Sequence, residues 1–394
     1  MIFNKLKRIV NLWGNQFIFK ISNKRCEDSD SVIILKLDAL GDFIIWQDCA
    51  KEFKSIFENK KCVLLCNPVC KELAEKTFFF DDVITLDIKK FESSSEYRKE
   101  SISYLNKLKF GTLVNSVFSR TWAMDVIASE IPASNKIGME ADESKLNLSR
   151  RLLTNNTKNK LDSIYDNLIP TTKDELMELQ RNKELMIGLG NKSFKSAIPN
   201  LPKISSYLVP DFKFFIVFPG ASTPLKRWST DSFAKIINYV LSRYDYHCLI
   251  CGSEEESFLF GEIISNITDK GKVLNYCGKT SIIDLIALVQ NSGFVISNDT
   301  SGIHIAAASN VWGICIGACN NYGRFLPYIS DKGQGIVDIC CPDIVCRNCR
   351  NCRNSIRRMP LKCIINIFTR HQYLCMRMVD VNLLKDKIIK RKQI

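Results

Sequence analysis

The chain has 394 residues, of which 46% are hydrophobic and 25% charged, and its formal net charge is +13. This length exceeds what one hydrophobic core usually covers, so we expect two domains. No apolar stretch approaches the roughly 20 residues that a membrane-spanning helix needs, and no signal-peptide core opens the sequence. These features exclude a helical membrane protein and predict a protein retained in the cytoplasm.

Positive charge is concentrated at the two ends of the chain. Residues 1–25 carry a net charge of +6 and residues 346–394 a net charge of +11, so the remainder carries −4. Near the N-terminus, Leu6, Ile9 and Trp13 alternate with basic residues at the spacing of an amphipathic helix in an anionic lipid interface. A helix packed on the protein's own surface explains the same spacing equally well. Nucleic acid is not expected as a partner, because no recognisable binding module accompanies the charge.

From residue 31, short apolar runs alternate with amphipathic stretches. In the first half we expect strands at 31–37, 62–68, 81–87, 110–117 and 135–139, and helices at 43–57, 96–109 and 123–130. Residues 140–210 are polar and contain prolines, which predicts helices, loops and a linker. In the second half we expect strands at 213–220, 247–252, 273–278, 293–299 and 311–317, and helices at 230–244, 254–266, 281–291 and from 301. Such alternation predicts two parallel sheets, each covered by helices on both faces.

The first expected strand ends in the segment LKLDALGDFII (35–45). Gly41 permits close backbone approach there, and Asp42 lies where a carboxylate offsets the dipole of the next helix. Asp42 is therefore either a helix cap or a carboxylate placed for catalysis. The segment by itself favours the cap.

Two later segments join a strand to a helix through polar residues. In FPGASTPLKRWSTDSF (218–233), four side chains can donate to phosphate oxygens, although a surface loop with solvated cations is an equal alternative. These are Ser222, Thr223, Lys226 and Arg227. In CGSEEESF (251–258), the glutamates most simply interact with a helix dipole. The less favoured alternative is that one of them binds the hydroxyl groups of a ribose.

The segment SNDTSGIHIAAAS (297–309) is typical of a diphosphate-binding loop. Small residues at a helix start leave backbone N–H groups open to an anion. The polar positions are Asp299, Thr300, Ser301, Gly302 and His304. His304 is either a ligand contact or a satisfied core histidine, and its place beside an anion site favours the contact.

Taken in order, these segments resemble glycosyltransferase family 9, the bacterial lipopolysaccharide heptosyltransferases. The matches are Gly41-Asp42, Pro219-Gly220-Ala221, Lys226-Arg227-Trp228, Gly278 through Ser281, and Asn298 through Ala308. The resemblance covers roughly residues 31–330 and is weakest over 140–210. It implies a GT-B fold, which is α/β with two Rossmann-like domains whose parallel sheets face each other across a cleft.

The chain is predicted to have four parts. They are a basic amphipathic segment (1–30), an acceptor domain with a polar region and linker (31–205), a nucleotide-sugar donor domain (206–345), and a basic Cys-rich tail with a C-terminal helix (346–394).

The resemblance also implies an inverting, metal-independent transfer without a cofactor. Asp42 is similar to the general base that deprotonates the acceptor, and Lys226 to the cation that stabilises the leaving diphosphate. Inversion in one displacement needs a base on the acceptor side and charge stabilisation on the opposite side. The implied donor-binding residues are Gly41, Ser222, Thr223, Arg227, Glu256, Asp299, Thr300, Ser301, Gly302 and His304.

The chain has 17 cysteines, and those before the tail lie mostly in apolar runs, as reduced core thiols do. The tail resembles that of some family members with a Cys-x-x-Cys element and a late Cys-Met. Four cysteines there could hold a structural zinc, namely Cys346, Cys349, Cys363 and Cys375. The spacing is not that of a standard finger, so free thiols and a disulfide stay open.

The resemblance thus implies an enzyme that moves a sugar, most simply heptose from ADP-heptose, to a lipopolysaccharide core or other lipid-linked acceptor. Its expected place is the cytoplasm, peripheral at the inner face of the cytoplasmic membrane. One alternative is a related transferase that uses another nucleotide sugar for a different surface glycan. A second alternative is a non-catalytic protein that binds nucleotides or nucleic acid.

Overall fold

The computed structural model describes residues 22–140, 150, 153–173, 176–317, 322–342 and 374–392. The amphipathic segment expected at 1–21 lies outside these ranges, as do Cys346, Cys349 and Cys363. The described chain forms two compact units. Unit 1 holds the residues up to 173 together with 180–196, and unit 2 holds 176–179 and the residues from 197 onward. The sequence prediction placed the change of domain nearby, at 205–206.

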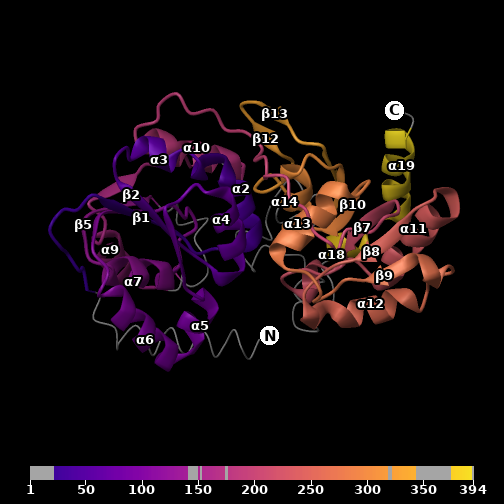
Figure 1. Ribbon diagram of the computed structural model, residues 1–394, viewed down its shortest axis with the longest axis horizontal. Helices are drawn as coiled ribbons and strands as arrows, with labels where there is room; N and C mark the ends of the chain where they lie inside the picture. The colour runs from indigo at the N-terminus through magenta and orange to yellow at the C-terminus, as the bar shows by residue number, and fades with distance from the viewer. Residues whose placement is uncertain are drawn as a thin grey trace. The chain divides into compact units, whose positions relative to one another are not determined.

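Unit 1 is built on a six-stranded sheet in which every pair of neighbours is parallel (Figure 1). Its strand order is β3-β2-β1-β4-β5-β6. The strands are β1 (Ser31–Lys36), β2 (Lys61–Cys66), β3 (Asp82–Thr85), β4 (Phe110–Asn115), β5 (Ala133–Met139) and β6 (Asn167–Ile169). The helices are α2 (Leu40–Ala50), α3 (Phe53–Ile56), α4 (Lys71–Thr77), α5 (Ile88–Ser93), α6 (Ser95–Leu105), α7 (Trp122–Glu130), α9 (Asn155–Asp162) and α10 (Glu178–Gly188), with a 3-10 turn η1 (Pro68–Cys70).

Two features of unit 1 differ from the sequence prediction. The helix expected over 43–57 is divided into α2 and α3, and the break brings Phe53 against Trp46 and Phe80, with ring centroids 5.6 and 6.3 Å apart. The region expected to hold only helices and loops contributes β6, a sixth strand that pairs with β5. Three residues are too short a strand to show an alternating pattern.

Unit 2 repeats the same topology with the order β14-β11-β10-β7-β8-β9, again all parallel. Its strands are β7 (Phe214–Phe218), β8 (His247–Ile250), β9 (Val273–Asn275), β10 (Val295–Asn298), β11 (Gly313–Ile316) and β14 (Val337–Cys340), beside a small antiparallel pair, β12 (Ile329–Ser330) and β13 (Gly333–Gln334). Its helices are α11 (Thr230–Arg243), α12 (Ser257–Ile264), α13 (Ile282–Asn291), α14 (Ser301–Ala308), α18 (Leu374–Arg377) and α19 (Val381–Lys392), with 3-10 turns η2 (Pro224–Lys226), η3 (Glu254–Glu256) and η4 (Lys270–Lys272).

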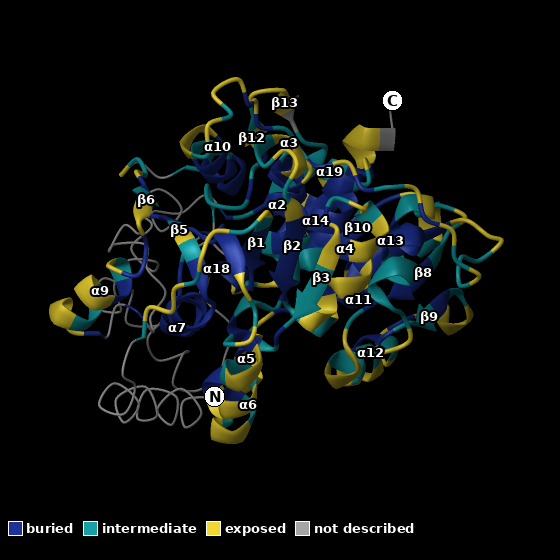
Figure 2. Ribbon diagram, turned by 60° about the vertical axis from the view of Figure 1, so that its left-hand side comes forward, coloured by how far each residue is buried: buried dark blue, intermediate teal, exposed yellow. Residues whose placement is uncertain are grey.

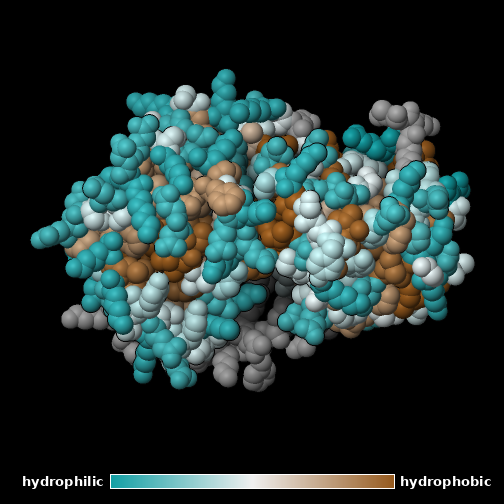
Figure 3. Space-filling model, in the orientation of Figure 1, coloured by the Kyte–Doolittle hydropathy of each residue, from teal (hydrophilic) through white to brown (hydrophobic). Residues whose placement is uncertain are grey.

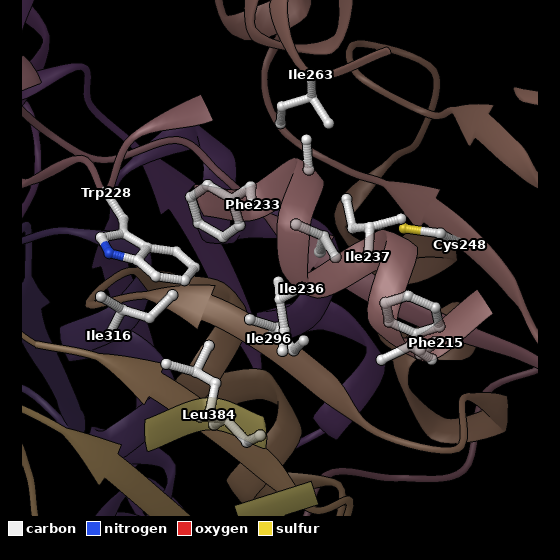
Figure 4. Packing of buried hydrophobic residues seen from close by; sticks show 14 of the residues in the cluster. Phe215, Trp228, Phe233, Ile236, Ile237, Cys248, Ile263, Ile296, Ile316 and Leu384 are labelled. Carbon is white, nitrogen blue, oxygen red and sulfur yellow. The ribbon is translucent and has the colours of Figure 1, made fainter. Parts of the chain in front are cut away.

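Each sheet is buried between helices, and most of its strand residues are inaccessible to solvent (Figure 2). In unit 2 one hydrophobic cluster joins the strands to α11 and to the C-terminal segment, through residues such as Phe233, Ile296 and Leu384 (Figure 4). The C-terminal segment, residues 374–392, thus contributes buried side chains to the core of unit 2. Within the described ranges, no helix is long and apolar enough to cross a membrane, and the visible surface is largely hydrophilic (Figure 3).

Nine of the described cysteines before the tail are buried, as expected of core thiols, and Cys26 and Cys341 are half-buried. Burial raises the pKa of the Cys62 thiol to about 11, which keeps it protonated near neutral pH. No described cysteine is paired in a disulfide.

Both sheets contain a point at which the chain reverses its direction of winding. In unit 1 it lies between β1 and β4, and in unit 2 between β7 and β10. The carboxyl ends of the two central strands diverge into opposite crossovers there, and ligands of open parallel sheets bind in the resulting crevice. The functional residues should therefore be sought after β1 and β4, and after β7 and β10.

Candidate active site

At the carboxyl edge of unit 2, Asn298 connects the ends of the two central strands. Its side chain is fully buried, and its amide Nδ2 donates to the carbonyl oxygens of Pro219 at 2.7 Å and Gly220 at 3.2 Å. Its Oδ1 accepts the backbone N–H of Trp228 at 3.1 Å. One side chain at the end of β10 therefore fixes the beginning and the end of the loop that follows β7.

The loop between these anchor points carries Lys226. The 3-10 turn η2 is closed by the N–H of Lys226, which donates to the carbonyl of Thr223 at 3.0 Å. The Lys226 ammonium lies 4.0 Å from a carboxylate oxygen of Asp299, and both side chains are largely buried. The structure thus brings together the cation and the carboxylate predicted from two separate motifs.

The other polar residues of this loop differ in their surroundings. Ser222 is exposed, whereas Thr223 and Arg227 are half-buried. The Arg227 guanidinium lies over the ring of Phe258 on α12, 5.4 Å from its centroid. Its Nε is buried and has no hydrogen-bond partner among the residues that the structure describes. Lys226 and Arg227 thus make this loop the basic part of the edge.

Glu256 lies at the same edge, against the start of the loop. Its Oε2 accepts the N–H of Ser253 at 3.0 Å, so part of the carboxylate is used in a capping box. A Cβ on Gly220 would lie only 2.0 Å from Glu256 Oε1, so a side chain at residue 220 would displace the Glu256 carboxylate. Contact with a ribose remains a prediction for Glu256.

The N-terminus of α14 is the third component of this edge. Thr300 occupies the N-cap position but makes no side-chain capping bond, and its hydroxyl lies 3.1 Å from that of Ser297. Ser301 and Gly302 form the first turn. A Cβ on Gly302 would meet the Phe218 ring at 2.4 Å, so glycine lets the helix approach the end of β7. The first turn carries no acidic residue, and its positive dipole end suits an anion.

His304 lies one turn further along α14, inside the protein. It is 5% exposed, and its Nδ1 is 2.5 Å from the hydroxyl of Tyr328, which is itself buried. Burial lowers the pKa of His304 to about 4, although Asp299 and Glu178 oppose the shift, so the imidazole is neutral near pH 7. The structure therefore gives His304 an internal partner, and a ligand contact remains a prediction.

In unit 1, Gly41 and Asp42 both lie within the first turn of α2. The helix starts at Leu40 with Ala39 at the N-cap, so Gly41 is not in the loop as the sequence suggested. Asp42 is half-exposed and is the acidic residue of this first turn. It is consequently not the cap, but its carboxylate still lies at the positive end of the helix dipole.

A buried ion pair precedes this turn. The Lys36 side chain at the end of β1 is 1% exposed, and its Nζ donates to Asp38 Oδ2 at 2.9 Å. Lys36 was not predicted from the sequence, although a lysine that ends a run of buried strand residues is a recognisable signal. Asn298 and Tyr328 were also missed as functional residues, because their partners are distant in the sequence.

The zinc prediction for the tail rests mostly on residues outside the described ranges. Of its four cysteines only Cys375 is described, and it is buried in the hydrophobic cluster of unit 2. Among the described residues, no group of three or more His, Cys, Asp or Glu side chains could hold a metal ion. A structural zinc therefore stays a prediction.

Two doubly wound parallel sheets in successive units are the architecture of the GT-B fold. The chain belongs to glycosyltransferase family 9 (heptosyltransferase), whose model matches residues 125–351. Among curated proteins it is similar to lipooligosaccharide heptosyltransferase 2 of Haemophilus influenzae, with 30% identity over 121 residues, or 29% of this chain. The chain thus spans about one third (33%) of the length of that relative.

Two solved structures share the fold. The ADP-heptose LPS heptosyltransferase II of E. coli is 12% identical and has a TM-score of 0.62, with 91% of this chain and 98% of that chain covered. The E. coli heptosyltransferase WaaC with ADP-2-deoxy-2-fluoro heptose is 13% identical and has a TM-score of 0.56, with 86% and 99% covered. These likenesses establish the architecture of this chain.

Proposed function

We propose that the protein transfers a heptose from ADP-heptose to a lipopolysaccharide core acceptor with inversion at the anomeric carbon. The observation that carries the proposal is the carboxyl edge of unit 2, where Lys226, Asp299 and the start of α14 meet in a member of this family. The two related structures, one of an ADP-heptose LPS heptosyltransferase and one of a heptosyltransferase with an ADP-heptose analogue, support the choice of donor.

In this proposal unit 2 binds the donor diphosphate. The N–H groups of the first turn of α14 and the Lys226 ammonium can stabilise the charge that develops on the leaving diphosphate. Asp299 lies 4.0 Å from Lys226 and can hold the ammonium in place before the donor binds. Catalysis then needs no metal in the active site, because these groups supply the positive potential.

Asp42 of unit 1 is the proposed general base. Its carboxylate takes the proton of the acceptor hydroxyl while the oxygen forms a bond to the anomeric carbon. The bond from that carbon to the diphosphate oxygen breaks on the opposite face, and ADP leaves. The first turn of α2 holds Asp42 at the positive end of the helix dipole.

Substitution of Asp42 tests this assignment. Asp42→Asn should lower kcat by about 10²- to 10⁴-fold, the usual contribution of a general base, while ADP still raises the melting temperature. Glu72→Gln is the matched control, because Glu72 is an exposed acid in the first turn of α4 in the same unit. Turnover of Asp42→Asn at the wild-type rate would remove the proposed base.

The donor can be tested separately by thermal shift. ADP should stabilise the protein more than UDP, GDP or CDP at equal concentration, because a ligand stabilises the folded state according to its affinity. Stronger stabilisation by another nucleoside diphosphate would favour the alternative of a related transferase with a different donor. No stabilisation by any of them would contradict a nucleotide-sugar enzyme.

We also propose that the protein works peripherally at the inner face of the cytoplasmic membrane, where a lipid-linked acceptor would be found. The support is the sequence of the two ends, with net charges of +6 and +11. Deletion of residues 1–21 should weaken sedimentation with anionic vesicles but not with neutral vesicles. Equal binding by the truncated chain would contradict a role for this segment.

A further inference from the structure

The loop that carries Lys226 is held by the C-terminal segment of the chain as well as by the strand ends. The indole N–H of Trp228 donates to the backbone carbonyl of Val379 at 2.9 Å, and both residues are buried. Val379 lies between α18 and α19, 151 positions further along the chain. This hydrogen bond links the end of the loop to the C-terminal segment of unit 2.

Val379 is a fixed point because the helices on either side of it are anchored. Met376, Leu384 and Ile388 are fully buried in the hydrophobic cluster of unit 2. The Lys387 ammonium donates to Asp338 Oδ1 on β14 at 2.9 Å. In Figure 4, Trp228 and Leu384 point into the same cluster from the loop and from α19. The carbonyl of Val379 can therefore restrain the indole.

The same tryptophan is also held from inside the sheet. Its backbone N–H donates to Asn298 Oδ1, and the other end of the Asn298 side chain holds the carbonyls of Pro219 and Gly220. The loop is thus closed at both ends by Asn298 and supported from outside by Val379. Lys226 lies inside this closed loop, two residues before Trp228, and contacts the residue that follows Asn298.

We infer that the C-terminal segment is a positioning element of the donor site, acting through Trp228 on Lys226. This inference rests on the proposed function, because it concerns the site that would hold the diphosphate. Electrostatic stabilisation of a leaving group depends on charges that are already in place before the reaction. A loop fixed at both ends and from outside loses less conformational freedom when the ligand binds, which improves affinity.

The test compares two tryptophans of one cluster. Trp228→Phe removes the N–H that reaches Val379 and keeps an aromatic ring. Trp312→Phe removes a similar bond, since the indole N–H of Trp312 donates to Asp338 Oδ2 at 3.0 Å, but it leaves Asp338 Oδ1 to hold Lys387. Trp312 directly precedes β11, whereas the loop lies at the carboxyl ends of the strands. Both variants should lower the melting temperature by a similar amount.

Binding of ADP separates a positioning role from a purely structural one. Measured by calorimetry on the full chain, the Kd for ADP should rise about three- to tenfold in Trp228→Phe and stay within about twofold in Trp312→Phe, since one hydrogen bond is at stake. The KM for the donor should rise in the same way, without a change in the KM for the acceptor. Equal effects of the two variants on ADP would overturn the inference.

A second pair of variants covers the case in which Trp228→Phe does not fold. Leu384→Ala loosens α19 of the C-terminal segment without changing the loop. Ile263→Ala is its control, because Ile263 on α12 is equally buried in the same hydrophobic cluster. The inference expects weaker ADP binding only for Leu384→Ala, and unchanged binding there would overturn it. A wild-type protein that does not bind ADP would overturn the proposed function and this inference with it.

Discussion

The buried histidine of unit 2 should make the stability of the protein depend on pH in a predictable direction. His304 has a pKa of about 4 in the folded protein, against an ordinary value of 6.5, and the main cause is burial. Below pH 6.5 the unfolded chain binds a proton that the folded protein does not bind. Stability from this group is therefore complete above pH 6.5 and is lost as the pH falls towards 4.

The size of the effect follows from the two pKa values. A difference of 2.5 between 6.5 and about 4 corresponds to ~3.4 kcal/mol in the free energy of unfolding once both states are protonated. At pH 5 the unfolded chain is almost fully protonated at this site and the folded protein is not. The loss there, relative to pH 8, should be about 2 kcal/mol.

Chemical denaturation of the wild type and His304→Asn at pH 8 and pH 5 measures this quantity. Other groups titrate in both proteins, so the quantity to compare is the difference in free energy of unfolding between wild type and His304→Asn at each pH. The wild type should lose about 2 kcal/mol more than His304→Asn between the two pH values. Histidine NMR gives a direct check, since the His304 ring should stay neutral down to about pH 4. Because burial is the main cause, the ring should also stay neutral in Tyr328→Phe, which lacks the hydroxyl. An ordinary titration near 6.5 in the folded wild type would refute the reasoning.

Three further predictions concern other sites. Gly302→Ala should lower the free energy of unfolding by about 1–3 kcal/mol, because the new Cβ would meet the Phe218 ring at 2.4 Å. Adding Phe218→Leu to the same chain should restore part of this loss, and a double variant whose loss equals the sum of the two single losses would contradict the prediction. Burial lowers the pKa of Lys136 to about 7, so between pH 6 and pH 9 the folded protein loses a proton that the unfolded chain keeps. In denaturation experiments the free energy of unfolding of the wild type, relative to that of Lys136→Met, should therefore rise by about 2–3 kcal/mol from pH 6 to pH 9, and a constant difference would contradict this. Asp125→Ala should cost about 3–5 kcal/mol, measured by denaturation, because it leaves the buried guanidinium of Arg120 without one of its carboxylate partners; a loss below 1 kcal/mol would contradict it.

The sheets could be predicted from the sequence because parallel strands buried on both faces appear as uninterrupted apolar runs. FFIVF in β7 and VIIL in β1 are such runs, and both lie inside their sheets. The division of α2 from α3 could not be predicted, because it depends on aromatic packing of Phe53 against Phe80, which lies on a different segment. Strand β6 was missed because its three residues owe their conformation to pairing with β5.

The position of the candidate site could be predicted for a related reason. Its motifs follow strands, and parallel strands place their carboxyl ends at one edge whatever the details of packing. The pairing of Lys226 with Asp299 follows from this rule, since β7 and β10 are neighbours at the point where the winding reverses.

The contacts that hold the site together could not be predicted in the same way. Asn298 is separated by 70 and 79 positions from the residues it binds, and Trp228 by 151 positions from Val379. No pattern along the chain encodes such pairs, because a hydrogen bond depends on distances of about 3 Å that only the folded backbone defines. Strand ends decide which residues can meet a ligand, whereas buried side chains from remote segments decide how firmly those residues are held. Substitutions at the first kind of residue should therefore abolish turnover, and substitutions at the second kind should weaken donor binding while leaving the reaction pathway unchanged.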